Sequence, residues 1–258
     1  MRSLSSWIGR NQSWSVRNFG RGDPSVSEGW NNYAKRNRKG DRHLGDEWGR
    51  PERMGLLVDI SQEEVPRYLD EKVFAPFLGR PGLLLEIGCG GGRFSEVLLR
   101  HADRVIAADT SPVMLSLVQK RFQGRSSLET MLLDGRGLSG IEDSSLDAAF
   151  SFGVFPHLQH WDIYNYLVEL RRTLKPNGKA VIQHSNTLSP LGWQRFLAAV
   201  EPSVNRHKLP WTFSVMTVEL MTEFVSRAGL ILEAAITDVA TRDCISLLSR
   251  PALDAGAV

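Results

Sequence analysis

Cysteine is scarce in this sequence: only two of its 258 residues are cysteine. Cys89 and Cys244 lie far apart and lack the CxxC or Cys/His spacing of a zinc site. Two cysteines also cannot form the dense disulfide framework of a small secreted domain. The histidines and carboxylates show no spacing typical of a metal site either. We therefore expect no metal and a metal-independent chemistry.

Long apolar runs are absent as well. No stretch approaches the roughly 18–20 residues that a membrane-spanning helix requires. The first ten residues, MRSLSSWIGR, lack the apolar core of a secretory signal. We therefore expect no membrane span and a cytoplasmic location.

The charge is nearly balanced overall, at +2, but it is unevenly distributed. Residues 1–55 contain 11 Lys/Arg and 6 Asp/Glu, whereas the remainder contains 20 and 23. The basic segment 31–43 is able to attract an anionic substrate, but a solvated or loosely folded extension is the favoured interpretation. It lacks the basic-aromatic interleaving of a nucleic-acid surface, so nucleic acid is not the expected partner.

The N-terminal third is expected to precede the main domain. Residues 1–27 are polar and predicted to be flexible, and 28–79 are predicted to form a helical extension or cap. Its aromatic residues suggest a helix near 28–38 and then a loop through 43–49. A capping-box pattern, Ser61 followed by Glu64, predicts a second helix ending near Leu78.

From residue 82 onward, apolar runs alternate with amphipathic segments. Strands are predicted at 83–87, 104–108, 129–133, 146–151, 178–183, 230–238 and 243–249, and helices at about 92–101, 112–122 and 162–174. Such alternation predicts an α/β fold with a parallel sheet between two helical layers. The short connection before the final run predicts a hairpin, with the last strand antiparallel to its neighbour.

The most informative segment is LLLEIGCGGGRF, residues 83–94. A predicted strand carries Glu86, and glycines follow at 88, 90, 91 and 92. Glycine permits positive φ and a close approach of the backbone to a ligand, and the next helix offers free N–H groups. A dinucleotide would require G-x-G-x-x-G, but Arg93 takes the place of the third glycine. Glu86 would repel a pyrophosphate and attract an ammonium group.

Further acids follow the next two predicted strands, Asp109 after the second and Asp134 after the third. Ser151 and Phe152 end the fourth. Ligands of open α/β sheets bind at the carboxyl ends of the strands, so these positions converge on one site. An aspartate after a strand is also a frequent helix N-cap, and Asp134-Gly135 is also ordinary turn chemistry.

The Glu-x-Gly-x-Gly-x-Gly pattern with two strand-end acids resembles motif I and its partners in the class I S-adenosylmethionine (SAM) dependent methyltransferases of the small-molecule type. The resemblance covers about residues 80–250 and implies a Rossmann-like three-layer sandwich. Its sheet would have seven strands, mostly parallel, with an antiparallel last strand. Lys179 departs from the family, which often has glycine there.

The resemblance also implies SAM as the cofactor and a set of residues that bind it. Glu86, Gly88 and Gly90 would hold the methionine end, Asp109 the ribose, and Asp134 the adenine edge. The full set of cofactor-binding residues implied in this way is Glu86, Gly88, Cys89, Gly90, Asp109, Thr110, Met114, Asp134, Gly135, Ser151 and Phe152.

The predicted reaction is methyl transfer to a small-molecule or sugar-containing acceptor, with oxygen favoured. An alcohol needs a general base, and His184 and His157 are the candidates, although buried histidines are often only structural. Residues 186–215 are predicted to be a lid or an ordinary packed helix. The alternatives are an N-methyltransferase, an RNA methyltransferase, a non-catalytic SAM-binding regulatory module and a dinucleotide oxidoreductase.

Overall fold

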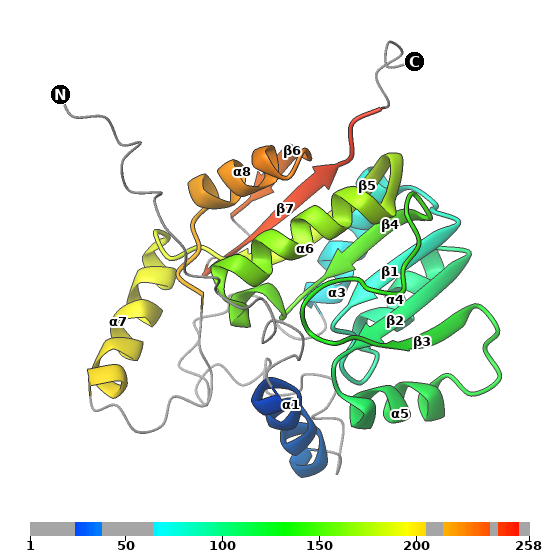
Figure 1. Ribbon diagram of the computed structural model, residues 1–258, viewed down its shortest axis with the longest axis horizontal. Helices are drawn as coiled ribbons and strands as arrows, with labels where there is room; N and C mark the ends of the chain where they lie inside the picture. Colours follow the sequence, from blue (N-terminus) through cyan, green and yellow to red (C-terminus); the bar gives the residue numbers. More distant parts are fainter. Residues whose placement is uncertain (1–23, 38–63, 205–213, 238–241, 253–258) are drawn as a thin grey trace, which may run out of the picture.

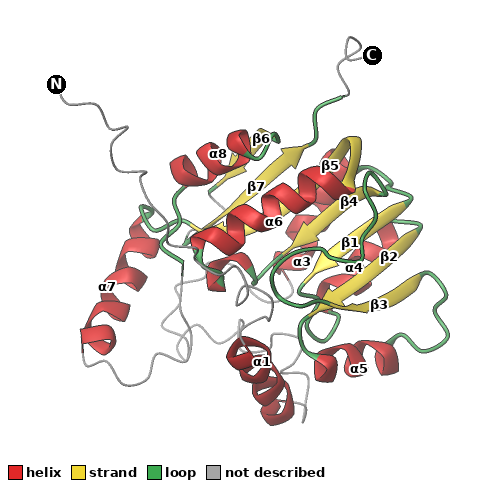
Figure 2. Cartoon of the chain, in the orientation of Figure 1, coloured by secondary structure: helices red, strands yellow, loops and turns green. Residues whose placement is uncertain are grey.

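A computed structural model describes residues 24–37, 64–204, 214–237 and 242–252 (Figure 1). Within these residues seven strands form one sheet in the order β3-β2-β1-β4-β5-β7-β6. The strands are β1 Leu83–Ile87, β2 Arg104–Asp109, β3 Leu128–Leu132, β4 Leu146–Ser151, β5 Leu174–Ser185, β6 Ile231–Ile236 and β7 Asp243–Ser249. Helices cover both faces of this sheet, so the predicted three-layer α/β fold is confirmed (Figure 2).

Strands β1 to β5 pair in parallel, and β7 lies antiparallel between β5 and β6. The predicted hairpin of the last two strands is therefore confirmed. The chain order reverses at β1, which pairs with β2 on one side and with β4 on the other. This reversal is the switch point at which open α/β sheets bind their ligands.

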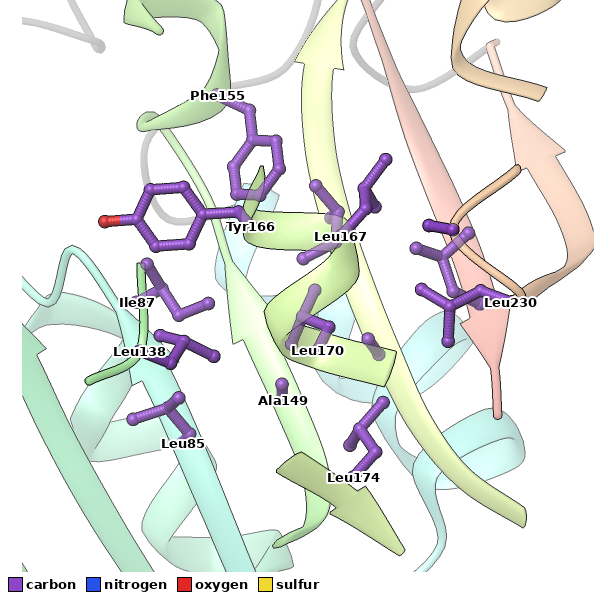
Figure 3. Close-up of a cluster of buried hydrophobic side chains, with 14 of the residues drawn as sticks. Leu85, Ile87, Leu138, Ala149, Phe155, Tyr166, Leu167, Leu170, Leu174 and Leu230 are labelled. Atoms are coloured by element: carbon purple, nitrogen blue, oxygen red, sulfur yellow. The ribbon is translucent and has the colours of Figure 1, made fainter. Parts of the chain in front are cut away.

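Helices α6 His160–Thr173 and α8 Val218–Arg227 cover one face of the sheet (Figure 1). Their buried side chains pack on the strands in the largest hydrophobic cluster, where Tyr166, Leu167 and Leu170 of α6 lie over strand residues such as Ile87 (Figure 3). Burying a leucine of this kind contributes about 1.5–3 kcal/mol relative to leaving it exposed. This cluster fixes β1 and β4 side by side, and both strands end at the switch point.

The other face is covered by α3 Glu64–Leu69, its continuation η5 Asp70–Leu78, and α4 Arg93–His101. Helix α5 Pro112–Arg121 packs beside them against β2. A single α-helix was expected to run to Leu78, but residues 70–78 form a π-helix. Pro76 explains the difference, because it lacks an N–H and its ring would clash with the carbonyl of an α-helical turn.

Strand β5 is longer than predicted, since it begins at Leu174 rather than at 178. Backbone hydrogen bonds from Asn177 to Arg250 and from Arg250 to Gly178 hold this early part beside the end of β7. Lys179, where the family often has glycine, donates to the Phe77 carbonyl and lies 4.9 Å from that ring. The lysine thus joins β5 to the end of η5.

Two helices outside the alternating pattern lie near the carboxyl end of the sheet. α1 Pro24–Asn37 corresponds to the helix predicted near 28–38 and packs against α5. α7 Pro190–Val204 corresponds to the packed helix predicted within 186–215. Figure 1 shows both helices at the same end of the sheet. The predicted loop at 43–49, the Ser61 cap and most of the flexible segment 1–27 lie outside the described residues.

Among the described residues, no helix has both the length and the apolar character needed to cross a membrane.

Candidate functional site

The glycine turn after β1 is held tightly against the neighbouring strands. The N–H groups of Gly88 and Cys89 both donate to the Ala108 carbonyl, at 2.8 and 2.9 Å. Gly88, Gly90 and Gly92 all have positive φ. A Cβ built on Gly88 would lie 2.0 Å from Val154 Cγ2, so the turn also approaches the segment after β4 too closely for a side chain. Glycine is required at Gly88 for both reasons.

Glu86 lies near the end of β1 with its carboxyl buried behind this turn. Its Oε2 accepts a hydrogen bond from the Ser95 hydroxyl on α4. Burial raises the pKa of Glu86 to about 8, and nearby Asp109 raises it further, against the Ser95 hydrogen bond and Arg121. A cationic ligand beside this carboxyl would favour its charged form, because an opposite charge lowers a carboxyl pKa.

Asp109 ends β2 and binds the glycine turn directly. Its Oδ2 accepts from the Gly90 N–H at 2.9 Å, and its Oδ1 accepts from the Ser111 N–H at 2.8 Å. Backbone N–H groups therefore hold both oxygens of this carboxylate. Burial raises the pKa of Asp109, although backbone N–H groups oppose the shift. Asp109 is not the N-cap of α5, because Ser111 caps that helix.

Thr110 follows Asp109 just before α5, and Met114 lies in the first turn of that helix. Met114 is buried, and its N–H donates to the Ser111 hydroxyl oxygen. A Cβ built on Gly135 would contact Thr110 Cγ2 at 3.4 Å, so the loop after β3 reaches the end of β2. Asp134 is exposed and accepts from the Arg136 N–H at 2.9 Å. This bond is the turn geometry that an Asp-Gly pair also predicts without a ligand.

The end of β4 lies beside the end of β1, on the side opposite to β2. The Ser151 hydroxyl donates to the Ile87 carbonyl at 3.0 Å and joins β4 to β1. Phe152 packs against Phe94 of α4 with ring centroids 5.0 Å apart. The ends of β1 and β4 therefore lie side by side at the switch point.

His157 lies in the short 3-10 helix η6 Phe155–His157, just beyond β4. Its ring packs edge-to-face on Trp30 of α1, with centroids 5.4 Å apart. Asn31 Oδ1 of α1 also accepts from the Ser111 hydroxyl at 2.7 Å. Helix α1 thus spans the carboxyl edge from the start of α5 to η6. Sequence reasoning missed Trp30 and Asn31 as site residues, although the aromatic content of 28–55 was a signal.

His184 lies inside the sheet, on β5, with no exposed surface. Its Nδ1 donates to the Ser185 carbonyl at 2.8 Å, and its Nε2 accepts from the Ser246 hydroxyl at 2.9 Å. The carbonyl can only accept, which fixes this neutral tautomer. Burial lowers the pKa of His184 to about 4. This geometry gives His184 a structural role and argues against its predicted role as a general base.

A chain of hydrogen bonds, which the sequence did not predict, joins the segment after β4 to β5 and β7. The Gly153 N–H donates to Gln183 Oε1 at 2.6 Å, and Gln183 Nε2 donates to Asp243 Oδ2 at 2.5 Å. Arg242 forms an ion pair with Asp243, and both side chains are largely buried. In the described part of the chain, no group of three or more His, Cys, Asp or Glu residues is arranged to hold a metal ion.

Comparisons with known proteins agree with this arrangement. Residues 85–182 match the sequence family described as a methyltransferase domain. The demethylmenaquinone methyltransferase of Clavibacter sepedonicus is 30% identical over 158 residues, which are 59% of this chain and 62% of that protein. The chain therefore aligns with less than two thirds of that relative. An uncharacterized methyltransferase of Mycobacterium bovis is 26% identical over 220 residues, 77% of this chain and 87% of that protein.

A solved structure shows the same fold. The N-methyltransferase NodS from Bradyrhizobium japonicum, in complex with S-adenosyl-L-homocysteine, superposes with a TM-score of 0.60 at 18% identity. The match covers 86% of this chain and 99% of NodS. This chain is therefore similar in sequence to methyltransferases over residues 85–182, and it has the fold of NodS.

Proposed function

We propose that this protein transfers the methyl group of SAM to a small-molecule acceptor, and that the acceptor atom is an oxygen. The observation that carries the proposal is the joining of the glycine turn to Asp109 at the ends of β1 and β2. Two buried carboxyls, Glu86 and Asp109, lie at this junction. Their chemistry suits an ammonium group and a ribose diol, and it is unfavourable for a pyrophosphate.

In this proposal each part of the cofactor contacts particular residues near this junction. Glu86, with the backbone of Gly88, Cys89 and Gly90, would bind the methionine end. Asp109 would accept from the ribose hydroxyls, with Thr110 beside it. Met114 would pack on the adenine, and Asp134 and Gly135 would lie at its edge. Ser151 and Phe152 would lie beside the sulfonium.

When bound, SAM supplies an electrophilic methyl group on a positively charged sulfur. The protein must then hold an acceptor lone pair in line with that methyl group, and such positioning accounts for several kcal/mol of barrier reduction. An alcohol must also lose its proton. His157 is the proposed base, because it follows β4 at the switch point, whereas the nitrogens of His184 are engaged within the sheet.

Helix α1 is proposed to be the cap that was expected from the sequence. Trp30 contacts His157, and Asn31 contacts Ser111, so the helix touches both sides of the carboxyl edge. A helix in this place would exclude water from the reacting atoms. In this proposal the catalytic domain covers residues 80–250, and the cap belongs to the segment before it.

The proposal is tested by calorimetric titration with SAM and with NAD, followed by incubation with a small-molecule extract and methyl-labelled SAM. We expect SAM binding, no NAD binding, and a labelled product whose methyl group resists mild acid and base, as an ether would. Binding of NAD without SAM would contradict the proposal. Tight SAM binding without any labelled product would favour a regulatory module, and a label on nitrogen or on RNA would change the acceptor.

A further inference from the structure

Gln183 is a fully buried amide near the carboxyl end of β5. Ser185, two residues later on the same face of that strand, pairs in register with Asp243 of β7. The side chains of Gln183 and Asp243 are therefore diagonal neighbours on one face of the sheet. Val181 lies on this face too, in the hydrophobic cluster against which Phe152 packs. In such apolar surroundings an amide is costly to bury unless both of its polar atoms have partners.

Both polar atoms of this amide have partners. Oε1 of Gln183 accepts from the Gly153 N–H at 2.6 Å, and Nε2 donates to Asp243 Oδ2 at 2.5 Å. Asp243 forms an ion pair with Arg242, so it is a carboxylate that can only accept, whereas a backbone N–H can only donate. The two partners thereby fix the orientation of the amide. The position requires one donor and one acceptor at the end of the same side chain, which glutamine supplies.

The Gly153 N–H belongs to the segment that follows the carboxyl end of β4. The preceding residue, Phe152, is proposed to lie beside the sulfonium. The next residue, Val154, lies against the glycine turn, since its Cγ2 is 2.0 Å from a Cβ built on Gly88. The Val154 carbonyl also accepts from the N–H of His157, the proposed base, at 2.8 Å. The peptide that the buried amide holds is therefore flanked by the cofactor side and the base side of the proposed reaction.

The backbone of Gly153 does not select this arrangement by itself. Gly153 has a φ of +75°, and glycine adopts positive and negative φ about equally readily. The hydrogen bond from its N–H to Gln183 therefore adds a preference that the residue lacks. Without that bond the peptide is free to turn, and the chain on both sides of it is free to move. A displacement of about 1 Å at reacting atoms is enough to slow a reaction roughly 10²-fold, so this one bond bears on the rate.

We propose that Gln183 is a positioning residue for methyl transfer, which holds the Gly153 peptide and through it the segment between the sulfonium and His157. This role rests on the proposed function, because it requires the cofactor and the acceptor to meet beside that segment. Gln183 itself contacts neither of them, and SAM is bound in the proposal mainly by the glycine turn and Asp109. Loss of the amide should therefore lower kcat and leave the affinity for SAM nearly unchanged.

The first test changes the polar atoms of this buried pair. Gln183→Met keeps the length of the side chain but cannot accept from the Gly153 N–H. Gln183→Glu keeps an acceptor but places a second carboxylate against Asp243, and adding Asp243→Asn supplies a donor again and restores the net charge of the pair. Gln119→Glu is the matched control, because Gln119 also donates from Nε2 to a side chain, Thr130 Oγ1, but at the exposed surface.

The rate of methyl transfer from labelled SAM is measured over a dilution series of the small-molecule extract, and the SAM dissociation constant is measured by calorimetry. We expect Gln183→Met and Gln183→Glu to lower the plateau rate at least about tenfold, with SAM dissociation constants within about threefold of the parent's. The double variant should recover at least about a third of the parent rate, because both hydrogen bonds of the buried pair are available again. Gln119→Glu should match the parent.

A plateau rate in Gln183→Met equal to the parent's would overturn this role, as would a change confined to the extract concentration that gives half the plateau rate. Equal losses in Gln183→Glu and in the double variant would also contradict it, because the restored donor would then have no effect. These outcomes leave the parent active, so they are distinct from failure of the proposed function, in which the parent itself transfers no label.

The second test needs neither a variant nor an acceptor. Amide hydrogen exchange of the full chain, free and saturated with S-adenosyl-L-homocysteine, is followed by mass spectrometry to single residues. The Gly153 amide should exchange at least about tenfold more slowly than an unprotected amide in both states. Exchange at the unprotected rate would show that Gln183 does not hold this peptide, whether or not the single variants fold.

Discussion

The Gly90 N–H donates to Asp109 Oδ2 at 2.9 Å, and this bond joins the glycine turn to the end of β2. The carboxylate thereby fixes the backbone of the glycine turn, and in the proposed function it also binds the ribose of SAM. Its removal is therefore expected to loosen the glycine turn and to weaken SAM binding.

Asp109→Ala should therefore weaken SAM binding by roughly 1.5–3 kcal/mol, the contribution of a hydrogen bond to a charged group. The measurement is the SAM dissociation constant by calorimetry. Asp103→Ala is the control, because Asp103 forms only an exposed ion pair with Arg80. A dissociation constant for Asp109→Ala equal to that of the control would refute the ribose-binding role.

In the proposed function, Glu86 is expected to make SAM affinity depend on pH. Its pKa is about 8 in the free protein, and an adjacent ammonium group would lower that value, so binding should release a proton below pH 8. The affinity should rise by up to about tenfold per unit between pH 6.5 and 8, and then level off. Calorimetry in buffers of different ionisation enthalpy counts the proton. Glu86→Gln should bind with a flatter pH profile, and an identical slope in parent and variant would exclude this linkage.

The raised pKa of Glu86 also predicts the sign of its effect on folding. The folded protein holds this proton more tightly than the unfolded chain does, so the contribution to stability is complete below about pH 4.5 and lost as pH rises through 8. Denaturant unfolding of the cofactor-free protein should show less loss of stability over this range in Glu86→Gln than in the parent.

The titration of His184 changes stability with pH in the opposite direction to that of Glu86. Its pKa is lowered to about 4 in the fold, so the unfolded chain binds the proton more tightly. Stability should fall by up to roughly 3 kcal/mol as pH decreases from about 6.5 to 4. His184→Gln, which cannot take up this proton, should be less stable at pH 7 but lose less stability on acidification. If the two proteins lost stability in parallel, His184 would not be the titrating group.

His157 is the histidine expected to affect the reaction. If the acceptor is an alcohol, His157→Asn should lower kcat by about 10²–10⁴-fold, the usual contribution of a general base, with little change in SAM affinity. The measurement is kcat at saturating SAM and acceptor, with the SAM dissociation constant measured alongside. A parent-like kcat in His157→Asn would indicate that the acceptor needs no base from this position.

Gly88 is expected to tolerate no side chain. Gly88→Ala should lose roughly 1–3 kcal/mol of folding free energy because its φ is positive. The clash of the new Cβ with Val154 should destabilise the protein further. Gly124→Ala is the control, since Gly124 has φ +82 but no atom within 4 Å of its built Cβ. The melting temperature of Gly88→Ala should be well below that of Gly124→Ala. Adding Val154→Ala to Gly88→Ala should recover part of this difference. Equal melting temperatures for the two alanine variants would show that Val154 moves aside at no cost.

Much of the fold follows from local pattern. The apolar runs predicted the strands because a parallel strand is buried on both faces, and the amphipathic segment at about 112–122 predicted α5. Boundaries differed where long-range contacts decided them: Arg250 extends β5 to Leu174, and Pro76 turns the helix before β1 into a π-helix. Such contacts come from distant parts of the chain, so no sequence window contains them.

The sequence by itself determined the glycine turn, Glu86 and the acid at the end of β2, because the carboxyl ends of parallel strands must meet at one edge. The tertiary structure decided the roles of the two histidines: His184 faces Ser246 inside the sheet, whereas His157 meets Trp30 at the edge. It also brought Gln183 of β5 against Asp243 of β7 and against the Gly153 N–H after β4. The burial of a side chain and the identity of its hydrogen-bond partners depend on how strands and helices pack. The hydrophobic periodicity of a segment does not specify which distant residue will contact it.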